Sequence, residues 1–315
     1  MITVAMPVYK SQYLQKAIES VINQSYKELE LIILNDHSPD ENIESIISNF
    51  NDSRIKYIKN ESNIGNYDLT EVWNQCLNLA QGEYFVLFSD DDIYHQDFLK
   101  EMILLSEKYH KVEIFHCRVK IIDKNDRTIS YTPLCPEWEN VMEFVWHRLK
   151  YYRLQYAPDF MCRTTSLKEK GGFIKFPLGW GSDDATWFTM SKRNGVAYTN
   201  KVLCNWRFSS LNISHIGALE KRLSAINLYS EWLKNFLNKL NIEGDKERDL
   251  FIEIRENLNG WRENAQRTVL FRNKKKSFHY ITLFREWFRY RKKYNISFKT
   301  FTKALFSIIQ TSRLK

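Results

Sequence analysis

Three consecutive carboxylates, Asp90, Asp91 and Asp92, are the strongest chemical signal in this sequence of 315 residues. Adjacent carboxylates repel one another and raise one another's pKa unless a cation lies among them. The triplet follows the apolar run Tyr84–Phe88 after a single residue, Ser89. Mg²⁺ and Mn²⁺ are commonly held by one or two carboxylates together with phosphate oxygens and water. Helix capping by solvated acids is the alternative, but the position at a strand end favours a metal site.

A second acidic pair, Asp183 and Asp184, follows Gly179–Ser182 and begins a segment with helical spacing. The helix dipole stabilises a carboxylate in the first turn, so an acid there stays ionised and can take a proton from a hydroxyl group. Capping of the helix by Ser182 with Asp183 explains the pair alone equally well.

The polar stretch Asn35–Asp40 follows a second apolar run. Asp36 could accept a hydrogen bond from a nucleobase N–H group, and Ser38 could cap the helix that follows. A plain strand-to-helix turn with Asp40 as its cap is the simpler interpretation when the stretch is taken alone. A nucleotide-binding role for this stretch is therefore favoured only if other polar loops lie beside it.

A third polar stretch, Trp206–His215, carries Arg207, Ser214 and His215. Arginine and hydroxyl groups on a loop could close over a diphosphate and neutralise its charge. A single histidine is more often structural, so this stretch is the weakest of the signals.

Four apolar runs alternate with amphipathic segments over the first 110 residues. This alternation predicts βαβ crossovers and an α/β fold with a mixed, mainly parallel sheet between helices. Ligands of such sheets bind beyond the carboxyl ends of the strands, where the loops at 7–9, 35–38 and 89–92 are expected to converge. The predicted strands are Ile2–Met6, Leu29–Leu34, Ile55–Ile58 and Tyr84–Phe88, and helical spacing covers residues 14–22, 43–47, 69–80 and 96–109.

Further strand-like runs near 112–123, 157–163 and 196–207 alternate with helical segments, and beyond about residue 216 the spacing is helical. A boundary is therefore expected near residue 215. The predicted parts are a catalytic domain over 1–215, its nucleotide-binding half 1–110 and acceptor half 111–215, and a basic α-helical C-terminal region over 216–315.

The bulk composition is that of a globular chain, with 43% hydrophobic and 27% charged residues. The five cysteines are scattered without a CxxC pair, which indicates free thiols in a reducing compartment. We find no signal-peptide pattern at the N-terminus and no apolar stretch long enough to span a bilayer. These features predict a cytoplasmic protein.

Residues 261–315 carry fifteen Lys or Arg residues and two acids, whereas the whole chain has a net charge of +8. Aromatic and basic residues interleave in this region, which predicts either peripheral binding to an anionic membrane on its inner face or a helical bundle with a solvated charged face. The basic residues follow no recognised nucleic-acid-binding module, so no nucleic-acid partner is expected.

In this order, the motifs resemble those of the inverting family 2 glycosyltransferases with the GT-A fold, especially the bacterial nucleotide-diphospho-sugar transferase type. The similarity runs from Ile2 to about Ser214. The matching residues are Met6–Tyr9, Leu34–Ser38, Asn63, Gly65, Asn74, Gln81–Tyr84, Ser89–Asp92, Gly171–Phe173 and Asp183 with Asp184.

The resemblance implies catalytic and metal-binding roles for the acids. Asp184, with Asp183 beside it, is the expected base that deprotonates the acceptor. Asp91 and its neighbours Asp90 and Asp92 are the expected ligands of Mn²⁺ or Mg²⁺.

The resemblance also implies contacts with the donor. Arg207, Ser214 and His215 are expected to neutralise the leaving diphosphate. Two departures from the family pattern are Lys10, where Asn is commoner, and Asn35, where an acid is frequent. The expected contacts with the donor nucleotide are Pro7, Val8, Tyr9, Asp36, Ser38, Asn63, Gly65, Asn74 and Asp90.

The function implied is metal-dependent, inverting transfer of a sugar from a nucleotide-diphosphate sugar, with UDP as the expected nucleotide, to the hydroxyl of a saccharide or lipid-linked saccharide. Synthesis of a bacterial capsule, lipopolysaccharide or another surface polysaccharide is the expected setting. A sugar nucleotidyltransferase is one alternative, but it would need a Gly-rich loop that Val8–Gln12 lacks. A non-catalytic nucleotide-sugar-binding protein is the other, and the presence of both acidic groups argues against it.

Overall fold

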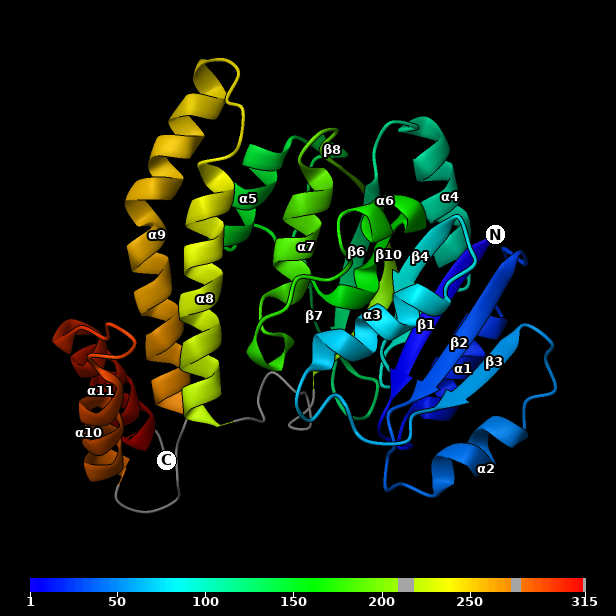
Figure 1. Cartoon of the computed structure of the whole chain (residues 1–315), viewed down its shortest axis with the longest axis horizontal. Coiled ribbons are helices and arrows are strands. Elements are labelled where there is room, and N and C mark those ends of the chain that lie inside the picture. Colours follow the sequence, from blue (N-terminus) through cyan, green and yellow to red (C-terminus); the bar gives the residue numbers. More distant parts are fainter. Residues whose placement is uncertain (209–217, 273–278, 314–315) are drawn as a thin grey trace. The chain divides into compact units, whose positions relative to one another are not determined.

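The chain forms two compact units. We call them the sheet unit, residues 1–175 and 182–212, and the helical unit, residues 176–181 and 213–315. The boundary predicted after residue 215 lies outside the described residues. Nothing in the sequence indicated that the short segment 176–181 belongs with the C-terminal helices. The computed structural model describes residues 1–208, 218–272 and 279–313 (Figure 1).

A mixed sheet of ten strands forms the centre of the sheet unit within the described residues. Its strands are β1 (Ile2–Val8), β2 (Leu29–Asn35), β3 (Ile55–Lys59), β4 (Tyr84–Leu87), β5 (Ile93–Tyr94), β6 (Ile114–Ile122), β7 (Thr128–Tyr131), β8 (Trp138–Glu139), β9 (Phe160–Arg163) and β10 (Val196–Arg207). Strands β3, β2, β1 and β4 lie side by side and run parallel (Figure 1). Strand β9 is antiparallel to both β4 and β6, while β6 and β10 pair in parallel. The predicted mainly parallel α/β sheet is confirmed.

Helices cover both faces of this sheet. The helices of the sheet unit are α1 (Leu14–Ile22), α2 (Asn42–Ser48), α3 (Leu69–Leu79), α4 (Phe98–Lys108), α5 (Val141–Leu149), α6 (Thr164–Glu169) and α7 (Ser182–Ser191). Side chains of β1 alternate between the faces, and Val4 and Met6 share one core cluster with residues of α1 and α4. On the other face, Trp187 of α7 packs against Phe160 and Phe173.

The parallel pairing of β1 with β2 and β4 brings the loops that follow these three strands to one edge of the sheet. The sequences of β1, β2 and β4 are mostly apolar because helices cover both faces of the sheet, which buries the side chains on either side. The edge strand β3 differs, since Lys56 and Lys59 lie along it, and charged residues on an edge discourage pairing with another chain.

The helical unit has its own core. Its helices are α8 (Leu219–Leu237), α9 (Asp245–Arg272), α10 (His279–Tyr290) and α11 (Phe298–Arg313). Leu223, Ile226, Leu270 and Ala304 belong to one buried cluster of this unit. Within the described parts of the chain, no helix combines the length and apolar character needed to cross a bilayer.

A buried polar network fixes the segment between α5 and β9. Arg153 is almost fully buried, and its guanidinium contacts His116 and forms an ion pair with Glu139. Glu139 also contacts His147 of α5. Because these partners lie on β6, β8 and α5, they hold the backbone of residues 150–156 in place, including Gln155.

We expect removal of one member of this network to be costly, because the remaining charge stays buried without its partner. Arg153→Met and Glu139→Gln should each lower the free energy of unfolding by about 3–5 kcal/mol. The double variant should lose less than the sum of the two, since neither charge is then left alone. Urea unfolding of the four proteins measures these losses, and strictly additive losses would show that the two side chains do not stabilise each other.

Candidate functional site

The Asp90 carboxylate joins the loop after β4 to the loop after β1. One of its oxygens, Oδ2, accepts hydrogen bonds from the backbone N–H groups of Tyr9 and Lys10, both at 2.9 Å. Burial raises the pKa of Asp90, while these two donors and the Lys10 ammonium lower it. The convergence of the two loops that the sequence predicts is therefore seen in the structure.

The loop after β2 joins the same edge. The Ser38 hydroxyl donates to the carbonyl of Tyr9 at 2.7 Å, and the backbone N–H of Ser11 donates to Asp40 at 3.0 Å. Pro7 and Val8 end β1, and the Val8 side chain lies in the core. Val8 can therefore meet a ligand only through its backbone, whereas the Tyr9 side chain is exposed.

Asp36 is buried and organises the loop that precedes α3. Its carboxylate accepts hydrogen bonds from the Asn60 amide at 2.8 Å and from the backbone N–H groups of Ile64 and Gly65 at 3.0 and 2.6 Å. A Cβ atom on Gly65 would lie 2.8 Å from Asp36 Oδ2, so this close approach requires glycine. A carboxylate can accept about four hydrogen bonds, which leaves Asp36 capacity for a further donor.

Asn63 and Asn74 have local roles in this structure. Asn63 accepts a hydrogen bond from the backbone of Asn66 at 2.9 Å. The Asn74 amide accepts from the N–H of Phe173 at 2.8 Å and donates to its carbonyl at 3.3 Å. This pair of bonds anchors the turn before Phe173, a geometry that favours a positioning role for Asn74 over the direct donor contact that the family resemblance implies.

Asp91 and Asp92 have different surroundings. Asp92 is buried and accepts a hydrogen bond from the backbone N–H of Arg207 at 2.7 Å. Asp91 is only partly buried, and no other described residue donates a hydrogen bond to its carboxylate. Of the three acids, Asp91 is the partly exposed one whose two carboxylate oxygens accept no hydrogen bond from another described residue, so it is the first candidate to bind a ligand.

The acids of the triplet are harder to ionise than ordinary aspartates. Burial and the charge of Asp90 raise the pKa of Asp91 to about 6. Burial and the charge of Asp91 raise the pKa of Asp92 well above its usual value. A bound cation would remove this penalty because it favours the charged form of each carboxylate.

Arg207 lies against the acidic loop, and its expected contact with a diphosphate stays a prediction. The Arg207 side chain is 0% exposed. Its Nε atom donates to the carbonyl of Asp91 at 2.7 Å, one terminal nitrogen lies 2.6 Å from the Asp126 carboxylate, and the guanidinium lies 3.9 Å from the Tyr13 ring centre. Arg207 therefore supports the acidic loop from beneath. The other two residues predicted for this role, Ser214 and His215, lie outside the described residues.

The second acidic pair lies in the first turn of α7. Both oxygens of Asp184 are 3.0 Å from Nε of Arg148, and the Gln155 amide donates to Oδ1 of Asp184 at 2.8 Å. Asp184 is buried and Asp183 is partly buried. Two side chains from one segment, at the end of α5 and just after it, thus fix the orientation of Asp184.

Asp183 titrates near neutral pH. Burial and the charge of Asp184 raise the pKa of Asp183 to about 7, against the lowering effect of Arg148. Since the two carboxylates interact, the proton taken up near pH 7 belongs to the pair. The pair therefore has the property that a general base requires, an affinity for one proton close to the working pH.

Sequence reasoning missed Arg148 and Gln155. They lie in a region without a recognisable motif, and only the fold brings them to Asp184. In the sequence Lys10 is only a departure from the family pattern, yet in the structure its ammonium lowers the pKa of both Asp90 and Asp91.

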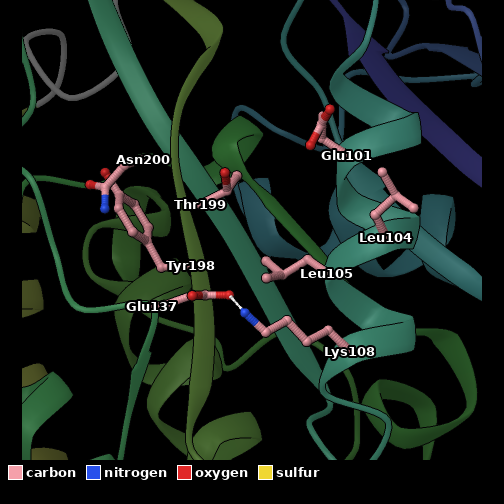
Figure 2. A pocket seen from close by; sticks show the side chains of 8 residues that line it. All are labelled: Glu101, Leu104, Leu105, Lys108, Glu137, Tyr198, Thr199 and Asn200. Atoms are coloured by element: carbon pink, nitrogen blue, oxygen red, sulfur yellow. Dashed lines mark hydrogen bonds and ion pairs between the residues drawn. The ribbon is translucent and has the colours of Figure 1, made fainter.

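Figure 2 shows a separate cavity of about 320 Å³ in the sheet unit. It lies beside α4 and β10, and an ion pair between Lys108 and Glu137 spans part of its wall. None of the predicted site residues lines it. The residues that do are Glu101, Leu104, Leu105, Lys108, Glu137, Tyr198, Thr199 and Asn200.

We predict that Asp183→Asn stabilises the protein at pH 8. The pKa of Asp183 is raised from its usual value near 4 to about 7 in the folded state, so its ionisation costs stability. This loss is absent below about pH 4, grows between about pH 4 and 7, and is complete above about pH 7. The substitution should add at least about 1 kcal/mol at pH 8 and little at pH 4. Thermal unfolding at both values tests this, and an equal or lower melting temperature at pH 8 would contradict the raised pKa.

Comparisons with known proteins identify the family. The profile of "Glycosyl transferase family 2" matches residues 3–170, more than half of the chain. An uncharacterized glycosyltransferase of Haemophilus influenzae is 24% identical over 238 residues, covering 74% of this chain and 72% of the relative.

Two solved structures are similar in fold. TarS of S. aureus in complex with UDP-GlcNAc matches with a TM-score of 0.64 at 15% identity, over 87% of this chain and 81% of TarS. The mannosyltransferase PcManGT of Pyrobaculum calidifontis, in complex with GDP-Man and Mn²⁺, matches with a TM-score of 0.57 at 13% identity, over 98% and 86% of the two chains. The profile, the relative and the shared GT-A fold together show that the chain belongs to glycosyltransferase family 2.

Proposed function

We propose that this glycosyltransferase takes a sugar from a nucleotide-diphosphate sugar, with a divalent cation at Asp91, and transfers it with inversion to an acceptor hydroxyl. The observation that carries the proposal is the joining of three loops at one sheet edge, around an acidic triplet that is costly to ionise without a cation. The acidic pair on α7 supplies the second requirement, a base for the acceptor.

The donor class is supported by the two structural neighbours. One was solved with UDP-GlcNAc and the other with GDP-Man, and both ligands are nucleotide-diphosphate sugars. We propose that the base lies over the edge formed by Pro7–Tyr9, with Asp36 accepting one hydrogen bond from it through its remaining capacity. A uracil N–H is a donor of the required kind, which makes a UDP-sugar the first donor to test.

The residues present fit a divalent cation. Among the described residues, no group of three or more His, Cys, Asp or Glu side chains could enclose a metal alone, but Mg²⁺ and Mn²⁺ commonly need only one or two carboxylates beside phosphate and water. Asp91 provides a partly exposed carboxylate, and Asp90 and Asp92 hold the loop that presents it. A bound cation would stabilise the negative charge that develops on the leaving diphosphate.

The acceptor proton is assigned to the pair on α7. Arg148 and Gln155 keep Asp184 in one orientation, and the coupling to Asp183 gives the pair its affinity for one proton near pH 7. Attack by the deprotonated hydroxyl on the face of the sugar opposite the diphosphate inverts the anomeric carbon. We propose a saccharide acceptor, including one carried on a lipid, as in the assembly of bacterial surface polysaccharides.

We predict that Asp91→Asn abolishes binding of Mn²⁺ together with a nucleoside diphosphate while the fold is retained. Titration calorimetry with Mn²⁺ and UDP should show a single site in the wild type that is lost in the variant, because one of few cation ligands is removed. Asp249→Asn, at an exposed acid of α9, is the matched control and should bind like the wild type.

The same proteins should be assayed for nucleoside diphosphate release from a UDP-sugar or GDP-sugar. Release should stop in EDTA and return with Mn²⁺ or Mg²⁺. Full activity in excess EDTA, or unchanged Mn²⁺ binding by Asp91→Asn, would refute the cation site. Release of pyrophosphate instead would identify a nucleotidyltransferase.

We predict that kcat/KM rises with pH through an apparent pKa near 7, because the pair must lose its proton before it can accept another. Arg148→Gln should raise the apparent pKa of kcat/KM by about 1 pH unit, since the arginine charge lowers the pKa of Asp183. Asp184→Asn should lower kcat by about 10²–10⁴-fold. Arg193→Gln removes an exposed arginine just beyond α7 and should leave the profile unchanged. If the apparent pKa of kcat/KM is the same in Arg148→Gln as in the wild type, Asp183 and Asp184 are not the general base.

A further inference from the structure

The two C-terminal helices keep aromatic side chains on their surface after the core of the helical unit has formed. Leu283 and Tyr290 of α10 and Phe301 of α11 are buried in that core. Phe284 and Phe288 of α10 and Phe298 of α11, in contrast, are 50%, 58% and 61% exposed. Ile281 of α10 is also exposed.

These exposed rings form one cluster. The centres of the Phe284 and Phe288 rings are 6.3 Å apart, and Phe284 lies 6.0 Å from the Phe301 ring. Phe298 lies 5.5 Å from Trp287, which also contacts Phe284. The cluster made by Phe284, Trp287, Phe288 and Phe298 is therefore continuous across both helices. Ile281, one helical turn before Phe284 and exposed, extends it along α10. We call these five residues the aromatic face.

The helices that carry the aromatic face are rich in positive charge. Between residues 281 and 307 the chain has seven Lys or Arg residues and one acid, Glu286. Within the described part of the chain only Lys293 of the seven forms an ion pair, with Glu220. Arg291 stacks on Phe288, with its guanidinium carbon 3.7 Å from the ring centre. The basic residues are Arg285, Arg289, Arg291, Lys292, Lys293, Lys299 and Lys303.

We propose that the aromatic face binds the surface of an anionic membrane. Exposed phenylalanines have no polar group to satisfy and gain by leaving water, while the bases on the same helices attract anionic headgroups. A nucleic acid would stack on the phenylalanine rings but leave the aliphatic Ile281 in water, whereas a membrane surface buries both kinds of side chain. A second copy of the chain would bring the same positive charges together. The surface is independent of the donor site, so its test does not depend on the proposed reaction.

The test is binding of the full chain to sedimenting vesicles of phosphatidylcholine, with and without phosphatidylglycerol. The wild type should bind the anionic vesicles and release in high salt. Phe288→Ser with Phe298→Ser should weaken this binding more than about tenfold, and Arg285→Gln with Arg289→Gln and Lys292→Gln should remove the preference for phosphatidylglycerol. Ile252→Ser, at an exposed apolar residue of α9, is the matched control and should bind normally.

Circular dichroism and thermal unfolding show whether each variant is folded, and substitutions at exposed positions should leave both unchanged. The Asp91→Asn protein should bind vesicles as well as the wild type, which separates this surface from the donor site. Equal binding of wild type and the double phenylalanine variant would overturn the proposal. So would dimerisation through these phenylalanines without vesicle binding, or tighter binding of a single-stranded oligonucleotide that depends on them.

Discussion

The Asp90 carboxylate, held by the backbone N–H groups of Tyr9 and Lys10, is the contact on which the candidate donor site depends. It ties together the loops after two parallel neighbours, β1 and β4, and makes a surface from segments far apart in the sequence. This arrangement places the three carboxylates of Asp90–Asp92 close together after the end of β4, where they repel one another. Burial and mutual repulsion raise the pKa of Asp91 to about 6, so the site is poised for a positive ligand.

The same principle recurs at the second acidic group with a different outcome. There a cation is built into the protein, because the Arg148 guanidinium lies against both oxygens of Asp184. Arg148 fixes one carboxylate while its neighbour, Asp183, keeps a pKa of about 7. The triplet Asp90–Asp92 therefore favours binding of an external cation, whereas the pair Asp183 and Asp184 favours binding of a proton. A transferase of this kind needs both, since it must stabilise a leaving diphosphate and deprotonate an acceptor.

The fold was largely predictable, and the contacts within the site were not. Long apolar runs predict the buried strands, and helical spacing of apolar residues predicts the amphipathic helices. The two-residue strands β5 and β8 are too short to show either pattern. Arg207 illustrates the limit: its position in the chain predicts a residue near the acidic loop, but its long-range contacts with Asp91 and Asp126 belong to no sequence pattern. Arg148 and Gln155 belong to no motif, so only the packing of α5 on α7 reveals them.

The most direct test of the account is the location of the cation. Crystals grown with Mn²⁺ and a nucleoside diphosphate would give an anomalous difference peak at the metal. We predict this peak at coordination distance, about 2.0–2.2 Å, from a carboxylate oxygen of Asp91, with the diphosphate as a shared ligand. A manganese ion bound elsewhere, or a diphosphate at this edge with Asp91 turned away from it, would contradict the central claim.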